Sequence, residues 1–332
     1  MSVRSAGTRT RHSADVVKEF ASDVQYYLTL SPRQLPSRYL YDGLGSALFE
    51  AICRLPWYAI TRAEARMLAT HGRTVFERLS GISKGIVRIV ELGSGDGEKL
   101  RVLAQAGART ARPLTIHLVD VSPSALTTSA RTLSELGDVA IVLHETTYEA
   151  GLEEIAREPR GAGRTLVVFL GSNIGNFDTP GANEFLAAIR RGLMPGDGLL
   201  LGADLVKPEP VLLAAYDDPL GVTAAFNRNL LLRINRELGG DFDIDGFDHQ
   251  AVWNEAAFRI EMHLVATRAQ QVRIPAAELE VTFDEGERIW TESSYKYEPD
   301  GVVAMLESAG FGCAAQWIDP VDRFALTLVE AV

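Results

Sequence analysis

The sequence predicts an α/β fold, in which helices cover both faces of a parallel sheet, with a second domain inserted near its end. Between residues 86 and 201, short apolar runs alternate with segments of helical periodicity, the pattern of βα units in a sheet buried on both faces. Residues 207–295 lack this alternation. A helical segment and two apolar runs follow them, so we expect the chain to return to the sheet at its end.

The elements of the sheet can be placed in order. We expect strands over residues 86–92, 114–119, 166–170 and 199–201. Phe185, Leu186, Ile189 and Leu193 recur at helical spacing, which predicts a helix packed on the sheet and ended by the Pro-Gly pair that follows. After the insertion we expect a helix over 302–309 and strands over 311–317 and 324–328. Such sheets bind ligands at the carboxyl ends of their strands.

These patterns give the domain boundaries. The sheet domain is predicted to comprise residues 63–206 and 296–332, and the second, α+β domain residues 14–62 and 207–295. Residues 1–13 are basic and polar without an apolar run behind them, so we expect a flexible tail.

Composition and charge narrow the classes of partner. The 332 residues are 46% hydrophobic and 23% charged, as in a globular protein with a large core. The net charge of −11 disfavours nucleic acid and anionic membranes, because both repel an acidic surface. No apolar run approaches the ~20 residues of a membrane span. We therefore expect a small-molecule partner, with no nucleic acid and no membrane.

Cysteine and histidine spacing predicts neither a disulfide nor a metal. Cys53 and Cys313 lie far apart, which favours a reducing, cytoplasmic compartment. The six histidines form no HxxxH pair. Residues 241–246 match the first half of an EF-hand loop, but Val252 stands where a bidentate glutamate is required, so we predict an acidic surface turn.

A glycine-rich turn follows the first predicted strand of the sheet. Glu91, Gly93, Gly95 and Gly97 form an E-x-G-x-G-x-G pattern before a helix that begins near Glu98. Glycine lets the backbone approach a cofactor closely and adopt positive φ. This spacing is typical of class I S-adenosylmethionine-dependent methyltransferases, whereas nicotinamide-binding turns read GxGxxG. The turn alone leaves open another nucleotide or a purely structural role.

Further features at strand ends favour S-adenosylmethionine. Asp120 ends the next strand about 25 residues after the glycines, where a carboxylate can accept both ribose hydroxyls. Gly171 lies in a Phe-Leu-Gly-Ser segment at the end of a later strand, and a Met-Pro-Gly-Asp-Gly turn precedes the one after it.

Several stretches together resemble the histidine-specific α-N-methyltransferases of ergothioneine biosynthesis, which convert L-histidine to its trimethylated betaine, hercynine. These stretches are residues 41–46, 55–58, 91–99, 169–176, 215–218, 221–229, 259–262 and 291–294. Gly-Val-Thr-Ala-Ala-Phe-Asn-Arg-Asn at 221–229 and Gly-Ser-Asn-Ile-Gly-Asn at 171–176 are the most distinctive. The resemblance implies a class I, Rossmann-like methyltransferase domain with a second domain that recognises the substrate.

The resemblance also implies roles for the substrate residues. Asn176 and Tyr216 would hold the substrate carboxylate. The remaining residues would surround the imidazole and the pocket: Tyr58, Glu292 and Ser294 as polar readers of the ring, Met262 packed against it, and Tyr41 and Phe49 as lining. Glu292 would discriminate between substrates, because a buried carboxylate without an imidazole N–H partner is costly.

The remaining roles concern the cofactor and the proton. Lys99 would bind the cofactor's carboxylate, and S-adenosylhomocysteine would be the product. Thr147 and Tyr148 stand where the family has an acid and an aromatic residue near the adenine. Asn173 replaces the usual threonine, and with Tyr41 it would hold the water that takes the amine proton; both are therefore candidate catalytic residues.

Three alternatives remain open. An α-N-methyltransferase for another amino acid, such as tryptophan, is suggested by Asn173 and by Ala59, which departs from the family pattern, whereas Glu292 and Met262 argue against it. A non-catalytic S-adenosylmethionine-binding protein is suggested by Thr147, where the acid is missing. A nicotinamide-dependent oxidoreductase is disfavoured by the glycine spacing.

Overall fold

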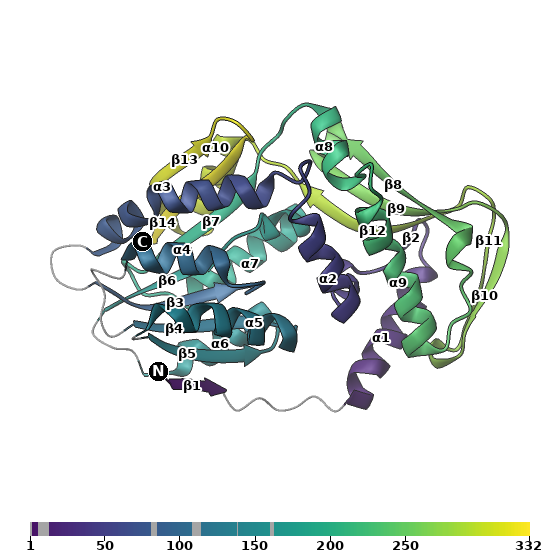
Figure 1. The fold of residues 1–332 in the computed structure, drawn as a ribbon, viewed down its shortest axis with the longest axis horizontal. Coiled ribbons are helices and arrows are strands. Elements are labelled where there is room, and N and C mark those ends of the chain that lie inside the picture. The colour runs from purple at the N-terminus through teal and green to yellow at the C-terminus, as the bar shows by residue number, and fades with distance from the viewer. Residues whose placement is uncertain (1, 6–12, 81–84, 108–113, 138, 160–162) are drawn as a thin grey trace. The chain divides into compact units, whose positions relative to one another are not determined.

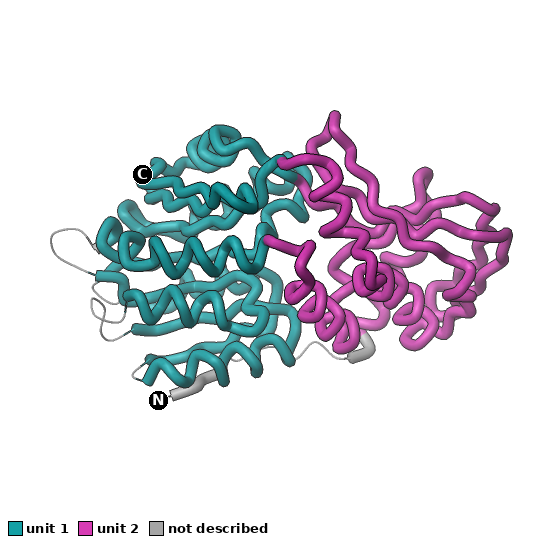
Figure 2. Tube along the Cα trace, turned by 45° about the horizontal axis from the view of Figure 1, so that its top comes forward, with its two compact units in different colours: residues 1–8, 60–206, 296–332 teal, residues 9–59, 207–295 magenta. Residues whose placement is uncertain are grey.

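The chain folds into two compact units, which Figure 2 colours separately. The computed structural model describes residues 2–5, 13–80, 85–107, 114–137, 139–159 and 163–332. Unit 1 comprises Met1–Thr8, Ile60–Val206 and Lys296–Val332, and unit 2 comprises Arg9–Ala59 and Lys207–Tyr295.

Unit 1 is built on an eight-stranded sheet with the order β1-β5-β4-β3-β6-β7-β14-β13 (Figure 1). The strands, in this order, are Ser2–Ser5, Val139–Glu145, Leu114–Asp120, Ile86–Leu92, Arg164–Phe169, Gly198–Asp204, Phe324–Ala331 and Phe311–Asp319. Neighbours from β1 to β7 pair in parallel, whereas β14 and β13 are antiparallel to theirs. The predicted α/β class is confirmed, and the order β5-β4-β3-β6-β7 brings the carboxyl ends of five parallel strands to one edge.

Helices cover both faces of this sheet (Figure 1). On one face lie α3 (Ile60–Ser80), α4 (Glu98–Gly107) and α5 (Pro123–Leu133), and on the other α6 (Tyr148–Arg157), α7 (Thr179–Arg191) and α10 (Pro299–Ser308). Their apolar stripes close two separate cores, one over each face. All seven residues of β7 are buried, as expected for a strand covered on both sides.

Two features of the fold differ from the prediction. The expected flexible tail, residues 1–13, is wrong for β1, which pairs with Ala140–Leu143 of β5, and for Ser13, which begins α1; residues 1 and 6–12 lie outside the described residues. An edge strand needs only backbone partners, so its composition did not reveal it. Strand β5 was not among the strands that we expected.

Unit 2 combines helices with a four-stranded sheet of order β2-β12-β9-β8 and a β10-β11 hairpin. Its helices are α1 (Ser13–Leu28), α2 (Gly43–Ile52), α8 (Glu209–Tyr216) and α9 (Val222–Leu238). Its strands are β2 (Arg33–Gln34), β8 (Phe247–Asn254), β9 (Arg259–Ala266), β10 (Gln270–Ile274), β11 (Leu279–Phe283) and β12 (Arg288–Tyr295). Helices α8 and α9 contact β8 and β9, and α2 packs on α9.

The acidic turn of unit 2 is exposed, as predicted. Asp241, Asp243 and Asp245 all face solvent. Asp241 accepts a 2.6 Å hydrogen bond from the backbone N–H of Arg273, and Asp243 pairs with Arg268. Among the described helices, none combines the length and apolar character needed to cross a membrane.

Candidate active site

The glycine-rich turn after β3 adopts backbone conformations that favour glycine. The φ angles are 83° at Gly93, 51° at Gly95 and 77° at Gly97. A Cβ at Gly93 would lie 3.0 Å from both Tyr148 Oη and Asn173 Nδ2, and one at Gly97 would lie 2.6 Å from Ser129 Oγ. Other residues would be strained here. The turn therefore brings three of the predicted cofactor and catalytic residues, Gly93, Tyr148 and Asn173, into one group.

Asp120 ends β4 beside this turn and is oriented by the backbone. Its Oδ2 accepts from Ser94 N at 2.9 Å and its Oδ1 from Ser122 N at 2.8 Å. Burial raises the pKa of Asp120, and the hydrogen bonds from Ser122, Ser94 and Gly95 partly oppose that shift. A carboxylate offers about four acceptor positions, so with bonds from Ser94, Gly95 and Ser122 in place Asp120 retains capacity for a ribose hydroxyl.

Glu91 is a buried carboxyl group whose hydrogen bonding is incomplete. Its side chain is 3% exposed, and among the described residues its Oε2 has no hydrogen-bond partner. Burial holds the pKa of Glu91 well above its usual range, and the positive charge of Lys99 only partly opposes that rise. An unpartnered buried oxygen is costly, so this atom fits a ligand that brings a donor. The ammonium group of S-adenosylmethionine is such a donor.

The predicted cofactor residues Lys99 and Gly171 share one carboxylate, that of Glu64 on α3. Lys99 Nζ donates to Glu64 Oε2 at 2.6 Å, and Gly171 N lies 2.9 Å from both Glu64 oxygens. Glu64 lies outside every motif quoted above, and sequence reasoning missed it. It lies near the start of α3 between Ala63 and Ala65, and only the folded chain shows what its carboxylate contacts.

Thr147 and Tyr148 begin α6. Thr147 is its N-cap, with Oγ1 accepting from Ala150 N at 3.4 Å. The Tyr148 ring contacts Phe169 and Phe185, with centroids 5.6 and 5.8 Å away. Burial raises the pKa of Tyr148, so its phenol stays protonated beside Gly93.

Asn173 and Asn176 lie in a short helical turn, Asn173–Asn176, after β6. Ser172 precedes the turn with φ 58°, and its Oγ accepts from Asp204 N at 2.9 Å. Ile174 O accepts from Tyr297 Oη at 3.1 Å. These bonds fix the distinctive 171–176 motif at the carboxyl ends of β6 and β7, with Asn176 exposed at its end.

In unit 2, the other predicted substrate residues form one connected cluster. Ring centroids lie 5.4 Å apart for Tyr41 and Phe49, 6.2 Å for Phe49 and Tyr58, and 6.2 Å for Tyr58 and Tyr216. Phe226 of α9 packs 5.4 Å from Tyr41 and 5.9 Å from Phe49. Phe226 lies in the 221–229 motif but was not predicted as a site residue.

Polar groups complete the cluster. Tyr216 Oη and Ser294 Oγ are 2.8 Å apart. Glu292 lies two residues before Ser294 on the same face of β12, directly opposite Met262 of β9. Burial and the nearby acidic groups, Glu292 among them, hold the pKa of Tyr58 well above its usual value, so its hydroxyl remains a donor.

Two of the stretches that carry the family resemblance, residues 41–46 and 221–229, meet through a helix cap. Asp42 is the N-cap of α2 and accepts from Gly45 N at 2.7 Å. It also accepts from Asn229 Nδ2 at 2.8 Å, at the end of the 221–229 motif. These bonds hold α2 against α9 and so set the positions of Tyr41 and Phe226.

Comparison with known proteins identifies the family. Residues 20–331 match the model of the histidine-specific, S-adenosylmethionine-dependent methyltransferases. The chain belongs to this family. It is 44% identical to a histidine N-alpha-methyltransferase of Mycolicibacterium smegmatis and 45% to one of Mycobacterium tuberculosis, in each case over 92% of this chain and 93% of the relative. An ergothioneine biosynthesis protein 1 of Neurospora crassa is 30% identical over 86% of this chain and 32% of its own length.

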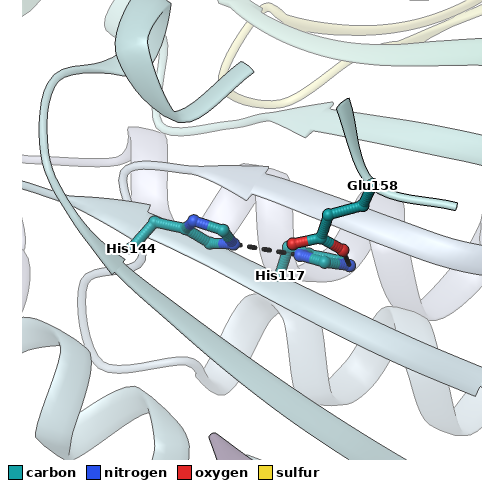
Figure 3. A group of neighbouring side chains, drawn as sticks. All are labelled: His117, His144 and Glu158. Atoms are coloured by element: carbon teal, nitrogen blue, oxygen red, sulfur yellow. Dashed lines mark hydrogen bonds and ion pairs between the residues drawn. The ribbon is translucent and has the colours of Figure 1, made fainter. Parts of the chain in front are cut away.

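Away from these groups, the methyltransferase contains a buried histidine pair on the α6 face of its sheet (Figure 3). His117 Nδ1 and His144 Nε2 are 3.0 Å apart, His144 Nδ1 lies 3.1 Å from Glu154, and Glu158 lies 3.7 Å from His117 Nε2. Potential ligand atoms of His117, His144 and Glu158 lie within 4.8 Å of one another, a grouping that the sequence spacing did not reveal.

The geometry of the pair is that of a hydrogen bond. Two nitrogens bound to one tetrahedral zinc ion lie about 3.3 Å apart, with both lone pairs aimed at the ion. Here the two ring nitrogens face one another at 3.0 Å, with ring centroids 5.3 Å apart, so a ring would have to turn to admit an ion. If His144 donates to Glu154, His117 donates to His144, and among the described residues His117 Nε2 then has no hydrogen-bond partner.

We expect His117 to make the methyltransferase sensitive to acid. Burial, helped by His144 and Arg88, lowers the pKa of His117 from 6.5 to about 3. As the pH falls, His117 therefore takes up a proton in the unfolded chain at a higher pH than in the folded protein. Stability is lost as the pH falls below the pKa of the unfolded chain. Between pH 7 and pH 5 this should remove about 2 kcal/mol of the free energy of unfolding, a loss that His117→Gln should escape. Urea unfolding of both proteins at both pH values measures the difference; equal losses would contradict the assignment.

Proposed function

We propose that the protein transfers methyl groups from S-adenosylmethionine to the α-amine of L-histidine, up to three times, giving hercynine and S-adenosylhomocysteine. The unit 2 cluster supports this most directly: Glu292 and Met262 lie opposite one another on adjacent strands, with the Ser294 and Tyr216 hydroxyls next to them. This combination of a carboxylate, hydroxyl groups and an apolar side chain matches the chemistry of an imidazole ring.

Each side chain of the cluster has a distinct task in this proposal. Glu292 accepts a hydrogen bond from an imidazole N–H, and the Tyr58 and Ser294 hydroxyls, which both donate and accept, serve the other ring nitrogen. Met262 packs on the ring, and Tyr41 and Phe49 line the pocket. Tyr216 donates from its phenol and Asn176 from its amide to the substrate carboxylate. These contacts are remote from the α-amine and leave space for methyl groups already added.

S-adenosylmethionine supplies the methyl group on a sulfonium, which is already a good leaving group. The protein's task is alignment and exclusion of water, and no strong base is required. The turn of Gly93, Gly95 and Gly97 provides close backbone approach, Asp120 accepts the ribose hydroxyls, Glu91 accepts from the ammonium and Lys99 pairs with the carboxylate. Tyr148 and Thr147 border the adenine. Tyr41 and Asn173 hold the water that receives the amine proton.

S-adenosylmethionine dependence and a small-molecule substrate follow from the family. A cytoplasmic location, the absence of a metal and the absence of nucleic-acid and membrane partners stay predictions from the sequence.

We expect kcat/KM for histidine to rise with pH towards the pKa of the substrate α-amine. An ammonium has no lone pair, and in this proposal a water and not a strong base receives the proton, so the neutral amine is the reacting form. Initial rates at subsaturating histidine between about pH 6 and about pH 9 measure this. A flat profile would contradict it.

The test of the proposed function is mass spectrometry of the twenty amino acids incubated with S-adenosylmethionine and the purified protein. Histidine alone should gain one to three methyl groups. Methylation of tryptophan or another amino acid would show that the substrate is not histidine. Cofactor binding without any methylated product would show that the protein binds S-adenosylmethionine without catalysis.

A further inference from the structure

Glu64 is the buried centre of the Lys99 and Gly171 contacts. Its side chain is 0% exposed. It accepts a 2.6 Å hydrogen bond from Lys99 Nζ. It also accepts from the backbone N–H of Gly171, whose nitrogen lies 2.9 Å from both carboxylate oxygens. Both partners only donate, and both are predicted to contact the cofactor. The carboxylate is therefore an acceptor shared by two separate elements, α4 and the turn after β6.

The sheet leaves space for this carboxylate. A Cβ at Gly202 in the middle of β7 would lie only 2.0 Å from Glu64 Oε1. Gly171 has φ 75°, and a Cβ there would lie 3.4 Å from Lys99 Nζ. The glycine at 202 thus permits Glu64 to occupy its position, which indicates a fixed arrangement and not a chance surface pair.

We infer that Glu64 is a positioning residue for the methionine end of the cofactor, acting through Lys99. This inference rests on the proposed function, in which Lys99 pairs with the cofactor's carboxylate. A lysine side chain has many rotamers, and a charged partner at 2.6 Å selects one of them before the ligand arrives. An ammonium has three N–H groups, so it can donate to more than one carboxylate.

Glutamine cannot replace Glu64 in this role. One end of its amide is itself a donor, and it would face either the Lys99 ammonium or the Gly171 N–H. The Glu64→Gln protein therefore keeps the shape of the side chain, but it loses the negative charge and sets an amide NH2 against at least one of these donors. Glu77→Gln is a matched control, since Glu77 lies on the same helix with a half-exposed side chain paired to Arg73.

Calorimetry with two ligands separates positioning from a general structural effect. S-adenosylhomocysteine carries the methionine end, whereas 5′-methylthioadenosine shares the adenosine but has no carboxylate. We expect Glu64→Gln to weaken S-adenosylhomocysteine binding about tenfold or more and to leave 5′-methylthioadenosine binding within twofold. In a Lys99→Met background, Glu64→Gln should have little further effect on S-adenosylhomocysteine. Glu77→Gln should bind both ligands like the wild type.

Other outcomes would overturn the inference. Equal weakening of both ligands would make Glu64 merely structural, and unchanged S-adenosylhomocysteine binding would remove its role. A full effect of Glu64→Gln in the Lys99→Met background would show that it does not act through Lys99. A wild-type protein that binds neither ligand would instead overturn the proposed function, and the inference with it.

Discussion

Replacing Glu292 with alanine is expected to lower kcat/KM for L-histidine about 100-fold or more and to leave S-adenosylhomocysteine affinity within twofold. The carboxylate lies opposite Met262 and two residues from Ser294. Its removal takes away the acceptor that we propose for an imidazole N–H and leaves the proposed apolar wall in place. A hydrogen bond to a charged group contributes about 1.5–3 kcal/mol, and a misplaced ring adds to this loss.

Steady-state kinetics with histidine and calorimetry with S-adenosylhomocysteine measure the two effects separately. Glu292→Gln keeps the side-chain volume and should also lose most activity, because its amide can present a donor where an acceptor is needed. Glu280→Ala, an exposed acid on β11 of the same unit, is the control and should leave both quantities unchanged. Loss of cofactor affinity together with histidine use would show that Glu292 is structural.

Most of the sheet could be predicted, because the strands at its centre carry their own signal. A strand buried on both faces is rich in apolar residues. In β3 and β4 this apolar run ends at the turn or acidic residue that follows, so both strands were placed to within one residue. The glycine turn was equally readable, since a backbone that needs positive φ at alternating positions admits few other residues.

What could not be predicted depends on tertiary contacts between side chains. Glu64 accepts hydrogen bonds from Lys99 of α4 and from Gly171 in the turn after β6. Both elements are far from Glu64 in sequence. His117 and His144 meet only because β4 and β5 pair in a particular register. Phe226 joins the aromatic cluster through the packing of α2 on α9. Spacing along one chain contains none of this information.

Replacing Asp120 with asparagine is expected to weaken S-adenosylhomocysteine binding about 100-fold. Both carboxylate oxygens already accept backbone N–H groups, from Ser94 and Ser122. An asparagine amide would place its own donor against one of these, which would turn the side chain, and it would remove the charge that we propose receives the ribose hydroxyls. Calorimetry of the purified variant measures the affinity, and thermal unfolding without ligand checks its fold. The exposed Asp300→Asn on α10 is the matched control.

The pH dependence of binding gives an independent test of the same residue. Burial raises the pKa of Asp120, so in the free protein its carboxyl takes up a proton at a higher pH than an exposed aspartate does. Protonation removes an acceptor and supplies a donor, as the asparagine does. Wild-type affinity should therefore fall on acidification, and the Asp120→Asn protein should lack that component of the fall. Parallel pH profiles for the two proteins, or an affinity for the variant within threefold of the wild type, would mean that the ribose is held by other groups.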